Sequence, residues 1–287
     1  MSEHFTRPTR SLAGRVAIVT GAGAAGNGIG NGRAAAILLA EAGCSVVCVD
    51  MKEELAQRTV QMISQDGFGR GTAVRANVTD TEECRGAVAI AMETYGRLDI
   101  LVNGVGVGGA VGTAVEVDLD AWARGMEVNV GSMVRMSKFA IPAMGKNRRD
   151  GQQCRGSIVN IASVAGIRGG NPHLLYPTSK GAVVNLTRAM AAHHADEGIR
   201  VNCVCPGMVY TPMMYAAGMS EEARESRKQR SLLKTEGTAW DVGAAIRFLA
   251  GDEARWMTGV ILPVDAGATV AAGSEVPKEA MTGSGQQ

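Results

Sequence analysis

Short runs of Val, Ile and Leu alternate along the chain with longer amphipathic stretches, starting at Arg15. Such apolar runs are typical of strands buried on both faces of a parallel sheet, with helices in the connections. The alternation therefore predicts a doubly wound α/β fold. The expected strands are short and rich in β-branched residues: Val16–Thr20, Ser45–Asp50, Thr72–Asn77, Ile100–Asn103, Ser157–Ile161, Arg200–Val204 and Val260–Val264.

The stretches between these runs show helical periodicity, and two of them open with acidic residues that suit a helix N-terminus. The expected helices are Gly32–Ala42, Glu53–Ser64, Thr81–Tyr95, Asp120–Met144, Ser179–Glu197 and Trp240–Ala250. We expect a single Rossmann-like domain over residues 14–270, with one parallel sheet of about seven strands. Residues 1–13 are expected to form an N-terminal arm, 208–236 a substrate lid, 145–156 a surface loop and 271–287 a loose tail.

Composition narrows the classes of function. A net charge of +1 creates no field that would gather nucleic acid or anionic lipid. The six cysteines have neither metal-ligand nor disulfide-framework spacing, so we expect reduced, mostly buried thiols and no metal site. No apolar run reaches the roughly 18 residues of a spanning helix, and residues 1–10 have no signal-like apolar core. These features predict a cytoplasmic protein that acts on a small molecule, without nucleic-acid or membrane partners.

A glycine-rich segment, Gly21 to Gly32, follows the first expected strand and precedes an Ala/Leu-rich helix. Glycines at such a turn let the backbone approach a pyrophosphate, whose charge meets the helix N-terminus. A flexible connector is the alternative, but strand, turn, helix and a downstream acid occur here in order. The segment predicts a dinucleotide site that includes Gly21, Gly28, Ile29 and Gly30.

The downstream acid is Asp50, at the end of the second expected strand. A carboxylate there can accept hydrogen bonds from both hydroxyls of an adenosine ribose, and it repels a 2′-phosphate. Asp50 therefore favours NAD over NADP. Two other interpretations stay open: Asp50 could cap the helix at Glu53, and Lys52 could soften the repulsion of a phosphate.

Tyr176 and Lys180 stand four residues apart and share one face once their segment is helical. An unperturbed tyrosine has a pKa of about 10 and is a poor acid or base at neutral pH. A nearby ammonium favours the phenolate and lowers that pKa, which makes the pair a candidate for proton transfer.

These motifs resemble those of the short-chain dehydrogenase/reductase family over roughly residues 14–267. The family's tyrosine-x-x-x-lysine motif matches Tyr176 and Lys180, and its serine matches Ser163. Further segments follow in the family's order: Asn103-Gly104-Val105-Gly106 resembles Asn-Asn-Ala-Gly, Asn129 matches a helix asparagine, and Pro206-Gly207 matches a Pro-Gly turn. The order of all these segments is far more specific than any one of them.

The resemblance implies catalytic roles for four residues. Tyr176 exchanges a proton with the substrate oxygen, and Ser163 hydrogen-bonds that oxygen. Lys180 lowers the pKa of Tyr176 and holds the nicotinamide ribose, while Asn129 holds a water that links Lys180 to solvent. Further cofactor contacts are implied for Asn77 and Val78 at the adenine, for Asn103, and for Val209 and Thr211 at the nicotinamide carboxamide.

The chain departs from the family pattern at three places. Its glycine-rich turn is longer than Thr-Gly-x-x-x-Gly-x-Gly, so the closing pair is either Gly28 and Gly30 or Gly30 and Gly32. Gly104 and Val105 replace the typical Asn-Ala, which puts in doubt the usual bracing of the central strand. Asn77 stands where aspartate is common.

The resulting hypothesis is reversible hydride transfer between NAD(H) and a secondary alcohol or ketone. Methionines in the segment 208–234 favour an apolar or cyclic substrate. The alternatives are a ring-diol dehydrogenase, an enone reductase on the same fold, or an NAD-sensing protein without turnover. The resemblance also implies a homo-oligomer, a tetramer or dimer, paired through the helices expected at Asp120–Met144 and Ser179–Glu197.

Overall fold

The computed structural model describes residues 7–65, 67, 69–148, 154–216 and 218–271. Its seven strands form one parallel sheet in the order β3-β2-β1-β4-β5-β6-β7. The strands are β1 (Val16–Thr20), β2 (Ser45–Asp50), β3 (Arg70–Arg75), β4 (Ile100–Asn103), β5 (Gly156–Ile161), β6 (Ile199–Pro206) and β7 (Ile261–Val264). From β1 the chain adds strands first toward one edge of the sheet and then, from β4, toward the other edge. Folds of this type bind ligands at the point between β1 and β4 where this order switches. The predicted doubly wound fold is confirmed.

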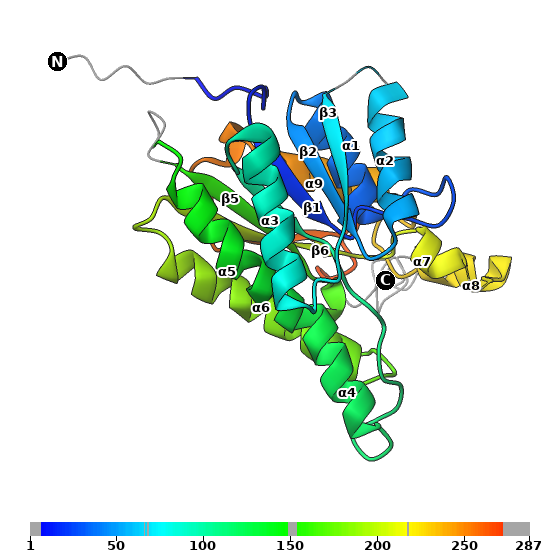
Figure 1. Ribbon diagram of the computed structural model, residues 1–287. Helices are drawn as coiled ribbons and strands as arrows, with labels where there is room; N and C mark the ends of the chain where they lie inside the picture. The colour runs from blue at the N-terminus through cyan, green and yellow to red at the C-terminus, as the bar shows by residue number, and fades with distance from the viewer. Residues whose placement is uncertain (1–6, 66, 68, 149–153, 217, 272–287) are drawn as a thin grey trace, which may run out of the picture.

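Helices cover both faces of the sheet, with α3, α5 and α6 in front of it in Figure 1 and α1 and α9 behind. They are α1 (Asn31–Glu41), α2 (Glu53–Gln65), α3 (Thr81–Tyr95), α4 (Leu119–Met126), α5 (Ser132–Gly145), α6 (Leu175–His193), α7 (Pro212–Tyr215), α8 (Glu221–Lys228) and α9 (Ala239–Ala250). Each face has its own apolar core, one built with α1 and α9 and the other with α3 and α5. The strands are thus buried on both sides, which explains their continuous apolar runs.

Local signals set the ends of several helices. Asp80 precedes α3, and its side chain accepts hydrogen bonds from the backbone amides of Glu82 and Glu83 at 2.8 and 2.9 Å. The helix ends at Gly96, whose φ of 77° is a left-handed conformation that favours glycine. Thr238 and Asp241 form a reciprocal capping box at the start of α9.

Several boundaries differ from the sequence-based expectation, and three of these differences lie beside candidate site residues. The third strand ends at Arg75 rather than Asn77, because the Asn77 side chain accepts hydrogen bonds from Thr79 in a turn before α3. The expected helix Asp120–Met144 is interrupted by a π-helical turn, Glu127–Gly131. The helix expected from Ser179 begins at Leu175, so Tyr176 lies within its first turn.

The segment expected to form a lid, 208–236, contains α7 and α8, on the right of Figure 1. Residues 272–287 of the expected tail (271–287) and 1–6 of the expected arm (1–13) lie outside the described residues, as do 149–153 of the expected loop. None of the helices in the described part of the chain combines the length and apolar character needed to span a membrane.

Candidate active site

Ser163 and Tyr176 come together at the carboxyl end of the sheet. Ser163 follows β5 and caps a 3-10 turn, Val164–Gly166, where its Oγ accepts a hydrogen bond from the Ala165 amide at 3.1 Å. Tyr176 is half-buried and lies in the first turn of α6. Burial raises the pKa of Tyr176, and a hydrogen bond with the Ser163 side chain opposes that rise. The Ser163 and Tyr176 side chains are therefore close enough to interact.

Lys180 lies one helical turn after Tyr176 and is buried, with 4% of its surface exposed. Its Nζ donates a hydrogen bond to the carbonyl oxygen of Ile161 at 3.0 Å and lies 5.7 Å from the centroid of the Tyr176 ring. Burial lowers the pKa of Lys180 to about 8, and the thiols of Cys203 and Cys205 oppose that shift. The lowering of the Tyr176 pKa by Lys180 stays a prediction.

The thiols that interact with Lys180 belong to Cys203 and Cys205 on β6. Their Sγ atoms are 3.9 Å apart, as expected for alternate residues on one face of a strand. Together with Cys44, Cys48 and Cys84 they are buried thiols, in agreement with the sequence-based expectation. No group of residues suited to a metal ion occurs among the described residues.

Asn129 lies in the π-helical turn between α4 and α5 and is completely buried. Its Oδ1 accepts a hydrogen bond from the Val107 amide at 2.8 Å, and its Nδ2 donates to the Val107 carbonyl and to Ser179 Oγ. The Asn129 side chain thus fixes the segment after β4 against α6, beside the position of Lys180. Its role in holding a water stays a prediction.

A steric constraint explains why glycine occupies position 104, where the family pattern has asparagine. A Cβ on this residue would lie 2.5 Å from the Thr20 carbonyl oxygen, so no larger residue fits without moving β1. The bracing is made by other groups: Thr20 Oγ accepts from the Gly104 amide at 3.1 Å, and Asn103 donates to Asn160 Oδ1 at 2.9 Å. The Asn103 Oδ1 atom is buried without a partner in the structure.

The long glycine-rich turn is organised by Arg33, a residue of α1 with no exposed surface. Its Nη atoms donate to the carbonyl oxygens of Gly26 and Gly28 at 2.9 and 2.5 Å, and of Ala24 at 3.0 Å. The other bonds reach α2, from Nη2 to the Leu55 carbonyl and from Nε to Thr59 Oγ1. All five N–H donors of a guanidinium are therefore used inside the protein.

The closing glycines of this turn can be distinguished by their surroundings. A Cβ on Gly32 would lie 2.1 Å from the Gly21 carbonyl oxygen, whereas one on Gly30 would lie 3.5 Å from its nearest neighbour. Gly30 is the residue that precedes α1. Gly32 therefore packs the first turn of the helix against the start of the loop, which favours Gly30 and Gly32 as the closing pair.

Asp50 ends β2 beside this turn and is half-buried. Its Oδ2 accepts a hydrogen bond from the Gly23 amide at 3.0 Å, and its Oδ1 accepts from the Lys52 amide at 3.1 Å. Each carboxylate oxygen keeps a lone pair for a further donor. Asn77 and the buried Val78 follow the neighbouring strand, β3.

The lid contacts the glycine-rich turn. Val209 and Thr211 are buried and follow β6, and Thr211 precedes α7. A Cβ on Gly28 would lie 2.5 Å from Pro212 Cγ and 2.8 Å from the Tyr215 hydroxyl. The first turn of the lid therefore rests on a backbone position without a side chain.

Comparison with known proteins fits this geometry. A family model described as enoyl-(acyl carrier protein) reductase matches residues 23–269. The meso-2,3-butanediol dehydrogenase of Serratia marcescens is 37% identical over 259 residues, which cover 90% of this chain and 96% of that protein. The cyclohexanol dehydrogenase of Acinetobacter sp. (strain SE19) is 35% identical, with coverages of 88% and 93%.

The same organisation occurs in a solved structure, a 7α-hydroxysteroid dehydrogenase complexed with NADH and 7-oxo glycochenodeoxycholic acid. It is 31% identical, covers 92% of this chain and 98% of its own, and superposes with a TM-score of 0.82. The chain belongs to the short-chain dehydrogenase/reductase family. This dehydrogenase/reductase is thus an oxidoreductase that acts on CH–OH groups of small molecules.

Three residues of this dehydrogenase/reductase were not found by sequence reasoning. Arg33 could have been noticed as the one charged residue in an otherwise apolar helix start, Gly32 to Ala40. Ser179 lies between Tyr176 and Lys180, and Thr20 directly precedes the glycine-rich turn. Their hydrogen bonds to Asn129 and Gly104 join segments that are far apart in the sequence. No sequence signal identifies such long-range partners.

Proposed function

We propose that this protein transfers a hydride reversibly between NAD(H) and a secondary alcohol or ketone. The observation that carries the proposal is that the Ser163 and Tyr176 side chains lie together at the carboxyl end of the sheet, with buried Lys180 one helical turn after Tyr176 and its Nζ 5.7 Å from the Tyr176 ring. Two adjacent hydroxyls can hold one substrate oxygen between them. The relatives' names, a butanediol dehydrogenase and a cyclohexanol dehydrogenase, support a secondary alcohol as substrate.

During alcohol oxidation, Tyr176 accepts the hydroxyl proton of the substrate and Ser163 donates a hydrogen bond to the developing alkoxide. The Lys180 ammonium stabilises the Tyr176 phenolate in that step, and Asn129 keeps the neighbouring segment in place. In the reverse direction Tyr176 returns the proton to the ketone oxygen. When bound, the nicotinamide accepts or supplies the hydride.

The residues at the turn fit a dinucleotide. Gly30, where an added Cβ would be 3.5 Å from its nearest neighbour, leaves room for the pyrophosphate at the N-terminus of α1, with Gly28 and Ile29 beside it. Gly21 and Gly32 allow the turn to pack closely against β4 and α1. Asn77 and Val78 would flank the adenine. The unpartnered Oδ1 of Asn103 and the buried Val209 and Thr211 would face the nicotinamide side, where Lys180 holds the ribose.

Two observations support NAD rather than NADP. The Asp50 Oδ2 atom bonds the turn at Gly23, its Oδ1 atom bonds the Lys52 amide, and both oxygens keep a lone pair that can accept a ribose hydroxyl. Arg33, the cation inside the turn, has all its donors engaged and offers none to a 2′-phosphate. The nearby Arg58 is bonded to Asn27 and Gln61.

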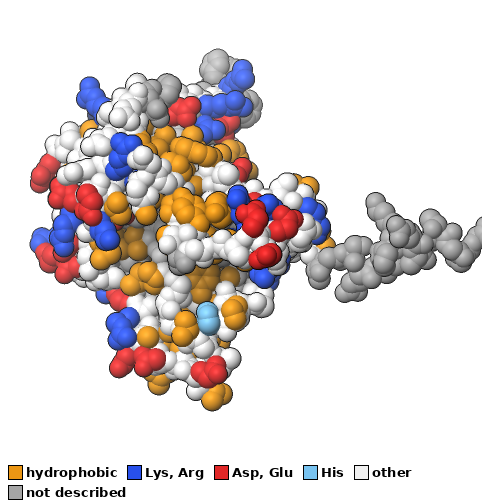
Figure 2. Space-filling view, turned by 90° about the vertical axis from the view of Figure 1, so that its right-hand side faces the viewer, with side chains coloured by type: hydrophobic (Ala, Val, Ile, Leu, Met, Phe, Trp, Pro, Cys, Tyr) orange, Lys and Arg blue, Asp and Glu red, His pale blue; other side chains and the backbone are white. Residues whose placement is uncertain are grey.

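An apolar or cyclic substrate is supported by the rim of the site. Val107, Leu174 and Met213 are exposed by 39, 37 and 67% and come from the segments after β4, β5 and β6. Figure 2 views the molecule from its lid side and shows hydrophobic side chains exposed among groups of charged ones. These segments meet above the catalytic residues, because parallel strands end at one edge.

We also propose that the protein acts as a homo-oligomer, a tetramer or dimer, paired through α4–α5 and α6. Leu119 and Val134 on α4 and α5 are exposed by 75 and 48%, apolar surface that pairing would cover. Light scattering at micromolar concentration measures the mass. A monomer would contradict the proposal.

The test of the proposed function is a spectrophotometric assay. Purified protein is mixed with NAD⁺ or NADP⁺ and a panel of secondary alcohols at alkaline pH, and the reduced nicotinamide is followed. We expect turnover with NAD⁺ and cyclic or apolar alcohols, lowered about 10²-fold or more in Tyr176→Phe. Tyr95→Phe, which loses a hydroxyl bonded to Thr72, is the matched control. Tight NAD⁺ binding without any turnover would indicate the sensing alternative instead.

A further inference from the structure

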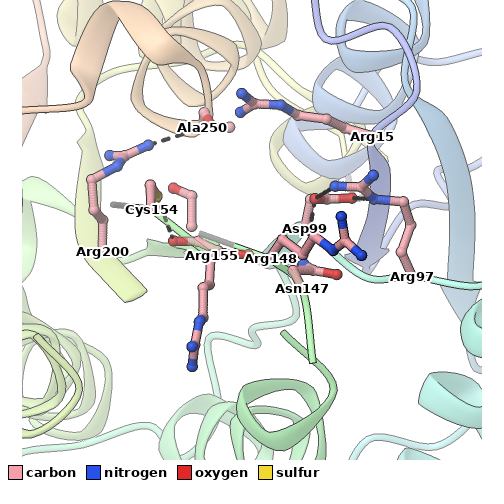
Figure 3. A pocket seen from close by; sticks show the side chains of 11 residues that line it. Arg15, Arg97, Asp99, Asn147, Arg148, Cys154, Arg155, Arg200 and Ala250 are labelled. Atoms are coloured by element: carbon pink, nitrogen blue, oxygen red, sulfur yellow. Dashed lines mark hydrogen bonds and ion pairs between the residues drawn. The ribbon is translucent and has the colours of Figure 1, made fainter. Parts of the chain in front are cut away.

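A separate cavity lies at the amino-terminal edge of the sheet, opposite the catalytic residues. Its walls come from the residues at the starts of β1, β4, β5 and β6 and from the segment after α5 (Figure 3). β1 and β6, of five and eight residues at about 3.3 Å per residue, place it roughly 15–25 Å from the catalytic edge. The cavity is therefore distinct from the dinucleotide site.

The charge lining this cavity is unbalanced. Among the described residues, a single carboxylate, that of Asp99, and five arginines line it: Arg15, Arg97, Arg148, Arg155 and Arg200. Asp99 forms a bidentate pair with Arg97 at 2.6 and 2.8 Å, and Arg15 pairs with Asp252 at 2.5 Å. The other three arginines form no ion pair with any carboxylate in the described residues.

Arg200 is the most deeply buried of the three cavity arginines that form no ion pair with a described carboxylate. Only 8% of this residue is exposed, and its Nη atoms donate to the carbonyl oxygens of Met257 and Gly251 at 3.1 and 3.2 Å. The Cys154 thiol also interacts with this guanidinium, but the Arg200 Nε atom is buried without a hydrogen-bond partner. A buried guanidinium without a counter-charge is unfavourable, because neutral carbonyls replace only part of its hydration.

An oxyanion would supply both the counter-charge and the hydrogen-bond acceptors that these arginines lack, since it carries negative charge and accepts several N–H bonds at once. The cavity volume of about 80 Å³ holds several waters, each of which needs about 10–15 Å³ on the same scale. That space suits a tetrahedral oxyanion and excludes a nucleotide. Asn147, whose Nδ2 binds the Leu98 carbonyl at 2.6 Å, closes the wall between the arginines.

We propose that this arginine cavity binds a phosphate group, either as inorganic phosphate or on a small phosphomonoester. In Figure 3 the Arg15, Arg148 and Arg200 side chains surround the space, while the Arg155 guanidinium points away from it. Arg148 is exposed and controls access, and Arg200 forms the buried wall. The inference is independent of the reaction proposed above.

The test is a titration of the full chain with inorganic phosphate at constant ionic strength, maintained with NaCl, followed by calorimetry and by Tm. A parallel titration uses glycerol phosphate, which separates the free ion from the ester. Saturating NADH is present in a second series, so that binding at the glycine-rich turn is recognised by its disappearance. We expect saturable binding that NADH leaves unchanged, with a Tm rise that NaCl alone does not give.

Variants assign the binding to the cavity. Arg148→Ala is expected to weaken phosphate binding about tenfold, because one charge-assisted hydrogen bond is lost, and Arg148→Lys to weaken it less. Arg200→Met is expected to abolish it. Arg85→Ala, which removes an exposed arginine of α3 that pairs with Glu82, is the matched control and keeps wild-type affinity. Equal affinity in wild type and Arg148→Ala, or no saturable binding at all, overturns the proposal.

Discussion

The Nζ atom of Lys180 lies 5.7 Å from the centroid of the Tyr176 ring. The ammonium is enclosed by β5 and β6, where its hydrogen bond to Ile161 replaces one bond to water. Burial therefore shifts the pKa values of the two groups in opposite directions, upward for Tyr176 and downward to about 8 for Lys180. Both shifts disfavour the charged forms that proton transfer requires, so the bound cofactor and substrate must help to create them.

The Lys180 shift predicts a dependence of stability on pH. With a folded-state pKa of about 8 against 10.5 in the unfolded chain, the unfolded state binds more protons between these values. The free energy of unfolding from this group therefore rises with pH from about 8 to 10.5, and the penalty is complete below 8. At about 1.4 kcal/mol per pKa unit, the rise is up to about 3 kcal/mol.

Urea unfolding of wild type and Lys180→Met at pH 7, 8, 9 and 10 measures this dependence. We expect the difference between wild type and variant to shift in favour of wild type as the pH increases. The lost hydrogen bond to Ile161 adds only an offset that does not vary with pH. Cys203 and Cys205 face Lys180 and are present in both proteins. Parallel curves for the two proteins would show that Lys180 has an ordinary pKa.

Asp50→Asn tests the choice of cofactor. The amide keeps an acceptor for the Gly23 N–H but removes the negative charge. We expect the ratio of kcat/KM for NADP⁺ to that for NAD⁺ to rise about tenfold, because the repulsion of a 2′-phosphate is lost. Initial rates with both cofactors measure it. An unchanged ratio would assign Asp50 to capping α2 rather than to the ribose.

Arg33→Met tests the organisation of the glycine-rich turn. The variant leaves four carbonyl groups and the Thr59 hydroxyl without their donor, so we expect a loss of about 3 kcal/mol or more in the free energy of unfolding. We also expect weaker NAD(H) binding by fluorescence titration. Arg58→Met removes an exposed arginine bonded to the same turn at Asn27, and it should cost no more than about 0.5 kcal/mol. Equal effects of the two substitutions contradict this role of Arg33.

Gly28→Ala tests the contact between turn and lid. The added methyl group would clash with Pro212 and Tyr215, so we expect α7 to be displaced and the KM for NAD⁺ to rise about fivefold. Unfolding should change little, because the lid is peripheral. Gly86→Ala on α3, where a Cβ meets nothing within 4 Å, is the control and should keep the wild-type KM. A wild-type KM in Gly28→Ala would show that lid and turn act independently.

Much of this fold could be predicted from the sequence because the helix and strand signals are local. Apolar runs marked every strand. β3 lies two residues earlier than expected, since the Asn77 side chain ends pairing early, and β6 extends two residues further, to Pro206. The π-helical turn around Asn129 was not predicted, because the apolar pattern continues through it and the interruption depends on contacts such as that with Val107. The short helices α7 and α8 likewise carry too few residues for a periodic pattern.

The sequence by itself determined the fold class, the family and the identity of Ser163, Tyr176 and Lys180, because strand periodicity and motif spacing are properties of neighbouring residues. Only the tertiary structure decided that Gly30 and Gly32 close the turn, that Arg33 organises it, and that arginines from separate strands share one cavity. These features depend on which segments meet in space. Steric fit, burial and unpaired charge arise only after the chain has folded, so no local pattern records them.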